Sequence, residues 1–268
     1  MARSRREAQR ERRRILVGTL AGLGALAIAA GAAWTWRLAR GDALDPQTLC
    51  PAGGPRGQVV LLVDRTDPLT FTQRQAFDGL LRDVVQKRTA PGALLSVFVL
   101  GDDVRDTAKP LIELCNPGTG AGASELTANP AQLHRQYEER FLRPLMKEAD
   151  ALVASAPAKD SPIMEMLQLV GINGFRAHDV SGPRRLIVVS DMLHNTAQFS
   201  MYHGAVAYAD FARTDYARRA QADLANVEVE LHVLMNTPRL QTQRQIRFWE
   251  EWFEQAGARI VAVQPMEG

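Results

Sequence analysis

Two carboxylates follow apolar runs of the chain, in positions where they could bind a cation. Asp64 comes directly after the run 59–63, and Asp191 comes one serine after the run 185–189. Hydroxyl groups accompany them, because Thr66 lies two residues beyond Asp64 and Ser161 stands before Pro162 in the intervening sequence. Oxygen ligands of this kind, with one or two carboxylates and several waters, are what Mg²⁺ prefers in proteins.

The same residues also have a purely structural interpretation. An Asp or Ser at the start of a helix satisfies free backbone N–H groups, and Ser161 before Pro162 is a typical helix-start signature. If Asp64 and Asp191 only cap helices as well, the chain is a metal-free scaffold. Both interpretations stand at this point.

Short apolar or alternating runs predict six strands, and amphipathic segments between them predict helices. The predicted strands are 59–63, 94–100, 111–114, 185–189, 227–235 and 259–263. The predicted helices are 71–87, 132–154, 162–169, most of 199–224, and 242–256. Strands that alternate with helices predict an α/β fold with a doubly wound, mostly parallel six-stranded sheet, in which the short third strand is antiparallel. Ligands bind such sheets beyond the carboxyl ends of the strands, where Asp64 and Asp191 stand.

This order of elements and motif residues resembles a von Willebrand factor A domain. That family carries Asp-x-Ser-x-Ser after its first strand, a Thr in a later loop and an Asp after its fourth strand. The matching residues here are Asp64, Thr66, Ser161 and Asp191. The resemblance covers about 59–263, and it implies a Mg²⁺ or Mn²⁺ ion at the strand tips that captures an acidic residue of a protein partner.

The chain departs from the family pattern at its third motif position. Pro68 stands there and has no side-chain oxygen, so Asp67, Thr70 or a water would have to compensate. We expect the stretch 193–202, just beyond Asp191, to shape the choice of partner.

The N-terminal residues predict a membrane anchor. Residues 1–14 carry seven Arg against two Glu, a charge of +5, whereas the whole chain carries +2 and the remainder therefore −3. Residues 15–36 follow without a formal charge, and about 20 apolar residues cross a bilayer as a helix. The basic residues place the tail 1–14 in the cytoplasm and the rest outside an inner membrane, in a periplasm. A cleaved signal peptide is the alternative, and it also exports the domain.

The two cysteines suit an exported protein. An even number in such a chain favours a disulfide, while two separately buried thiols are the alternative. In the strand order 3-2-1-4-5-6 that the resemblance implies, Cys50 lies just before the first strand. An antiparallel third strand then brings Cys115 to the same rim of the sheet, which favours a bridge between the two.

Together these features predict a tethered protein-binding module and no enzyme. Its parts are the tail 1–14, the membrane helix 15–36, a stalk 37–58 and the domain 59–268. The basic tail beside an apolar stretch favours anionic lipid over nucleic acid, and no small-molecule substrate is evident. The alternatives are a metal-free structural subunit of a membrane complex and a hydrolase that uses the same carboxylates and cation to activate water.

Overall fold

The computed structural model describes residues 18–19, 22–34, 44–101, 103–121, 129–154, 158–178, 180–204 and 206–268. The chain divides into two compact units, Met1–Ala43 and Leu44–Gly268. In the first unit, residues 18–19 and 22–34 are helical. The helices found in the described residues are all too short or too polar to cross a bilayer. The predicted tail 1–14 lies outside the described residues, and so do 15–17, 20–21 and 35–36 of the predicted membrane helix.

The second unit is built on a six-stranded sheet with the order β3-β2-β1-β4-β5-β6. Its strands are β1 (Gln58–Asp64), β2 (Leu94–Leu100), β3 (Ile112–Cys115), β4 (Arg184–Ser190), β5 (Val227–Leu234) and β6 (Arg259–Met266). All neighbouring strands are parallel except β2 and β3, which are antiparallel. The predicted α/β fold and its antiparallel third strand are therefore confirmed, in the strand order that the family resemblance implied.

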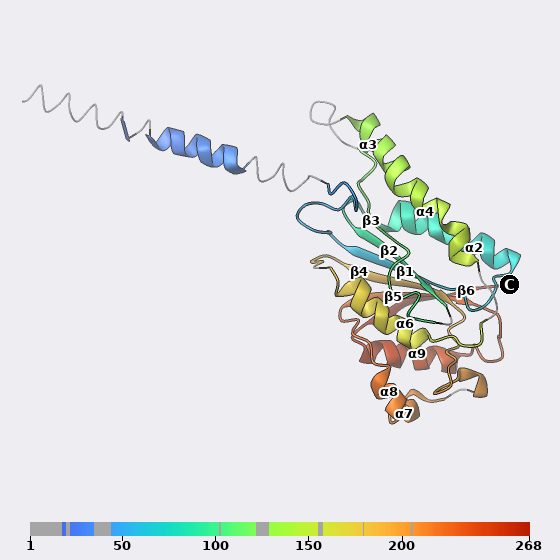
Figure 1. The fold of residues 1–268 in the computed structure, drawn as a ribbon. Coiled ribbons are helices and arrows are strands. Elements are labelled where there is room, and N and C mark those ends of the chain that lie inside the picture. The colour runs from blue at the N-terminus through green and yellow to red at the C-terminus, as the bar shows by residue number, and fades with distance from the viewer. Residues whose placement is uncertain are drawn as a thin grey trace, which may run out of the picture. The chain divides into compact units, whose positions relative to one another are not determined.

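Helices cover both faces of this sheet (Figure 1). One layer holds α2 (Phe71–Asp83), α3 (Pro130–Tyr137), α4 (Arg143–Lys147) and α5 (Ala149–Val153), with π-helical turns at η1 (Val84–Arg88) and η2 (Glu138–Leu142). The other layer holds α6 (Ile163–Leu169), η3 (Val170–Phe175), η4 (Met201–His203), α7 (Tyr208–Phe211), α8 (Asp215–Arg219) and α9 (Gln243–Gln255).

The alternation of side chains along each central strand explains the two layers. In β1, Val60 and Leu62 belong to the core shared with α6 and α9, whereas Val59, Leu61 and Val63 belong to the core shared with α2. Successive residues of a strand point to opposite faces, so a continuous apolar run buries both. The apolar strand runs in the sequence are therefore the direct cause of a sheet with helices on either side.

The segment 199–224 differs most from its prediction. In its described residues, 199–204 and 206–224, it contains only the short helices η4, α7 and α8, separated by loops. Its aromatic side chains pack on α9 instead of forming one helical stripe: the rings of Phe199 and Phe211 lie 5.9 Å and 5.1 Å from the ring of Phe248. The predicted helix was wrong here because these tertiary contacts outweigh helix propensity.

The predicted disulfide between Cys50 and Cys115 is confirmed, with the two Cα atoms 4.7 Å apart. It joins the segment before β1 to the last residue of β3. The sequence predicted a stalk at 37–58. Its residues 44–58 belong instead to the compact second unit.

Candidate metal site

The carboxyl ends of β1 and β4 lie side by side and begin the candidate site. The two strands are parallel neighbours in the register Val63↔Val189, so Asp64 and Ser190 end them at the same level. The Ser190 hydroxyl donates a hydrogen bond of 2.6 Å to Oδ2 of Asp64. The connections of β1 and β4 leave on opposite faces of the sheet, so this is the switch point where doubly wound sheets bind ligands.

Thr66 and Ser161 join Asp64 through their hydroxyl groups. The Thr66 hydroxyl donates to Oδ1 of Asp64 at 2.6 Å, and the Thr66 backbone N–H donates to the same oxygen at 2.9 Å. Oγ of Ser161 lies 3.2 Å from Oγ1 of Thr66, although 95 residues separate them in the sequence. All three side chains are buried.

Ser161 does not cap the helix that follows it, which corrects the helix-start interpretation. The N-cap position of α6 is Pro162, and no side chain caps that end. Ser161 is instead held by paired backbone hydrogen bonds with Asn195, at 2.7 Å and 3.0 Å. These bonds tie it to the loop that follows β4 and leave its hydroxyl facing Thr66.

Asp191 completes the set, one residue beyond β4. Its Oδ1 accepts the Leu193 backbone N–H at 2.9 Å, and its Oδ2 lies 3.4 Å from the hydroxyl of Tyr202. Burial and the negative charge of Asp64 raise the pKa of Asp191 to about 8. Burial also raises the pKa of Asp64, against the hydrogen bonds from Ser190 and Thr66.

The electrostatics of the site are those of two buried carboxylates without a positive partner. The largest influences on the pKa of each carboxyl group include no Lys, Arg or His among the described residues. No group of three or more His, Cys, Asp or Glu side chains converges anywhere in the described parts of the chain. An ion here would thus be held by two carboxylates, hydroxyls and water, a donor set that fits Mg²⁺ or Mn²⁺.

The auxiliary candidates occupy different positions. The charge of Asp67 is near enough to raise the pKa values of both Asp64 and Asp191. Thr70 is the N-cap of α2, and its hydroxyl accepts the Gln73 backbone N–H at 3.2 Å. Pro68 lies exposed between them. Asp67 is therefore near the carboxylates, whereas the Thr70 oxygen is already engaged in a helix cap.

Sequence reasoning did not identify Ser190 and Tyr202 as members of the site. Ser190 could have been found from the strand pattern, because a residue that ends β4 beside the end of β1 must face Asp64. Tyr202 carried no such signal, since it reaches Asp191 from η4, 11 residues further along the same connection after β4. Tyr202 lies in the stretch 193–202 that was expected to shape partner choice, and it is 44% exposed.

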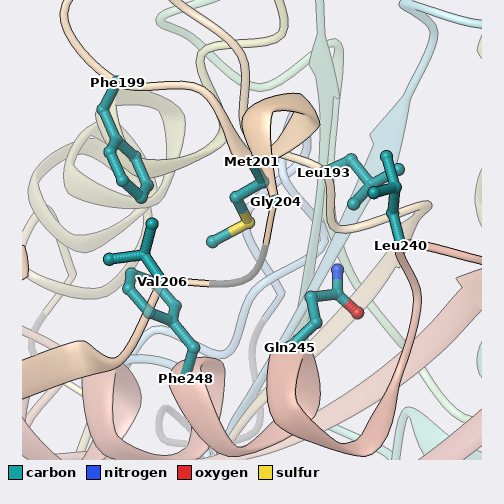
Figure 2. Close-up of a pocket in the computed structure, with 8 residues that line it drawn as sticks. All are labelled: Leu193, Phe199, Met201, Gly204, Val206, Leu240, Gln245 and Phe248. Carbon is teal, nitrogen blue, oxygen red and sulfur yellow. The ribbon is translucent and has the colours of Figure 1, made fainter.

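An apolar pocket adjoins the loop after Asp191, between that loop and α9. Figure 2 shows Leu193, Met201 and Phe248 on its walls and the amide of Gln245 at its edge. The internal space is about 10 Å³, the volume of roughly one water probe, whereas small-molecule sites have some 300–1,000 Å³.

Comparison with known proteins adds little to this geometry. No protein-family model matches the sequence, and no curated protein matches it. The manganese-loaded TRAP protein of Plasmodium vivax has a similar structure, with a TM-score of 0.34 and 15% identity over 66% of this chain and 57% of that one. An aerotolerance-related membrane protein from Bacteroides fragilis has a TM-score of 0.33 and 9% identity over 79% of this chain and 91% of that one. Similarity at this level assigns neither a family nor a function.

Proposed function

We propose that the protein is a membrane-anchored, extracytoplasmic module that binds a protein partner through a divalent cation at the strand tips. The observation that carries the proposal is the convergence of Asp64, Thr66, Ser161 and Asp191 at one switch point, with two buried carboxylates that have no positive partner among the described residues. Buried charges are costly unless they are paired or coordinate a metal. A cation bound between the two carboxylates would therefore reduce the free-energy cost of burying them.

Each residue of the site would contribute to ion binding in a different way. Asp64 and Asp191 supply negative charge, the hydroxyls of Thr66 and Ser161 supply neutral oxygens, and Ser190 keeps Asp64 oriented. Mg²⁺ or Mn²⁺ bound there would supply a positive charge to an acidic group of the partner. Because Pro68 has no side-chain oxygen, a coordination position of the ion would be open to this acidic group.

The surroundings of the site favour a protein as the ligand. Tyr202, which contacts Asp191, and Phe71, at the start of α2 after the Asp64 loop, are 44% and 77% exposed. Aromatic side chains of this kind are enriched at protein interfaces. We propose no catalysis, because the site offers no general base beside the carboxylates that would hold the cation.

Calorimetric titration of Mg²⁺ and Mn²⁺ into the detergent-solubilised full chain tests the cation. We expect saturable binding that Asp191→Asn abolishes. The control is Asp210→Asn, which changes an exposed carboxylate on α7 and should leave binding unchanged. Without cation, Asp191→Asn should not lower the melting temperature at pH 7, because burial and Asp64 raise the pKa of Asp191 to about 8 and the amide replaces a carboxyl group that is already mostly neutral. Absence of binding in the wild-type chain would overturn the proposal and leave a metal-free structural subunit.

The partner is tested separately, by affinity isolation from membranes with the wild-type chain and the Asp191→Asn chain as paired baits. We expect a partner that the wild type retains in Mg²⁺ and loses in chelator, and that Asp191→Asn does not retain. A partner held equally in all these conditions would show that binding does not use this site.

A further inference from the structure

Three N–H donors from the α9 region converge on the chain just after β4. Nε2 of Gln241 donates to the Asp191 carbonyl at 2.9 Å. Nε2 of Gln245 and Nε1 of Trp249 donate to the Met192 carbonyl at 2.7 Å and 2.8 Å. Residues spaced by four positions share one face of a helix, so Gln245 and Trp249 project from α9 toward the same peptide and Gln241 continues that row in the turn before it.

The three donor side chains are buried and hydrogen-bonded. Trp249 is fully buried, Gln245 is 5% exposed and Gln241 is 9% exposed. Gln241 also donates to the Leu234 carbonyl at the end of β5, at 2.6 Å. A buried donor that loses its acceptor is left unsatisfied at considerable cost, so the three side chains resist movement of the carbonyls that they bind.

The peptide that they hold is an unusual one. Met192 has φ 58°, a left-handed conformation that a bulky side chain rarely adopts. Such a conformation persists only where its surroundings impose it, and here two donors bind the Met192 carbonyl itself. This turn lies directly between the carboxylate of Asp191 and the Leu193 N–H that orients it.

Gln245 is poorly explained by packing alone. Its side chain borders the apolar pocket of Figure 2, and its Oε1 is buried without a hydrogen-bond partner among the described residues. A Met or Leu of similar volume would avoid that unsatisfied oxygen. The amide is therefore better explained by what its N–H groups do.

We propose that Gln241, Gln245 and Trp249 are positioning residues that hold the Asp191–Met192 turn, and thereby set the affinity of the cation site and couple it to α9. This inference rests on the proposed function. It adds that residues of α9 and of the turn before it, which would not touch the ion, tune the cation site through the turn that orients the Asp191 carboxylate.

The test compares three variants of the full chain. Gln245→Met keeps the volume and removes the side-chain amide, and Trp249→Phe keeps an aromatic ring and removes one donor. The control, Phe141→Leu, disturbs a fully buried ring of η2 in the core on the other face of the sheet. For each we measure the melting temperature without cation, the Kd for Mn²⁺, and the hydrogen-exchange rate of the Leu193 amide without cation.

We expect Gln245→Met to weaken Mn²⁺ binding by about tenfold or more, as loss of outer-shell partners does elsewhere, with a smaller loss in Trp249→Phe. Leu193 exchange should quicken in both. Phe141→Leu should lower the melting temperature without changing the Kd for Mn²⁺ or the exchange rate of the Leu193 amide. If Gln245→Met changes only the melting temperature, the residues are structural and the inference is wrong. If the wild-type chain binds no Mn²⁺, the proposed function fails, and Leu193 exchange still decides whether the clamp exists.

Discussion

His194 lies three residues beyond Asp191, and its ring is fully buried. Its Nδ1 accepts the Met164 backbone N–H at 3.4 Å, and its Nε2 lies 2.8 Å from the hydroxyl of Tyr216. That hydroxyl donates to Glu165 at 2.7 Å, so a neutral ring that donates from Nε2 to Tyr216 satisfies the whole chain of bonds. Burial lowers the pKa of His194 to about 3, and the folded protein therefore keeps it neutral at ordinary pH.

The lowered pKa of His194 predicts how the free energy of unfolding depends on pH in the acid range. The unfolded chain protonates His194 near pH 6.5, whereas the folded chain does so only near pH 3. The unfolded state thus binds more protons at His194 between these values, so the contribution of His194 to the free energy of unfolding should fall as the pH falls through this window, by at most about 1.4 kcal/mol per pH unit. The raised pKa of Asp191 acts in the opposite direction over the same range, so the test is the difference between two chains. In denaturant titrations from pH 7 to pH 4, the free energy of unfolding of the wild type should fall relative to that of His194→Gln. An equal pH dependence in the two chains would contradict the assignment.

At the scale of elements, the disulfide joins two segments that would otherwise be held weakly. The chain before β1 contacts the end of β3 where the Cys115 N–H donates to the Thr48 carbonyl at 2.8 Å. It contacts the turn before β2 where the Arg56 backbone N–H donates to the Gly92 carbonyl at 2.9 Å. β3 is a short edge strand with only its last residue buried. The bridge secures both the edge of the sheet and the entry of the chain into β1.

Loss of the bridge should therefore lower stability. Cross-linking of residues 65 positions apart restricts the unfolded chain, and its removal is expected to cost about 2–4 kcal/mol in the free energy of unfolding. Denaturant unfolding of the oxidised chain with and without reductant measures this. A Cys50→Ala, Cys115→Ala chain should match the reduced wild type and should not respond to reductant. An oxidised wild type that reductant does not destabilise would contradict the prediction.

At the scale of the whole molecule, the disulfide bears on where the folded unit resides. Such bridges form and persist in oxidising compartments and are rare in the cytosol. The basic tail 1–14 and the apolar stretch 15–36, which the sequence predicts to be a membrane anchor, would supply a route to such a compartment. The disulfide and the N-terminal pattern thus point separately to the extracytoplasmic placement that we propose.

Deletion of residues 1–36 tests this placement in cells. We expect the full chain in the membrane fraction with Cys50 and Cys115 oxidised, and the deleted chain in the cytosol with both thiols free. Fractionation followed by thiol alkylation and mass measurement distinguishes the two forms. A full chain that is soluble, or whose cysteines are reduced, would show that it is neither anchored nor exported as proposed.

Much of the fold could be predicted because it depends on local pattern. The predicted strand 94–100 coincides with β2, and the predicted helix 242–256 coincides with α9 within one residue at each end. Periodicity is a property of neighbouring residues, so sequence alone reveals it. The segment 199–224 could not be predicted in this way, because its aromatic side chains pack on the ring of Phe248, which lies on α9 outside the segment.

The sequence by itself determined the order of elements, the placement of Asp64 and Asp191 after their strands, and the pair of cysteines. Only the tertiary structure decided what the polar side chains do. Ser161 could cap a helix or face Thr66, and the choice depends on a contact across 95 residues. Ser190 contacts Asp64 across 126 residues, and Gln245 reaches Met192 across 53. A buried polar group takes whichever partner the packed fold brings within hydrogen-bond distance, and local sequence does not encode that partner.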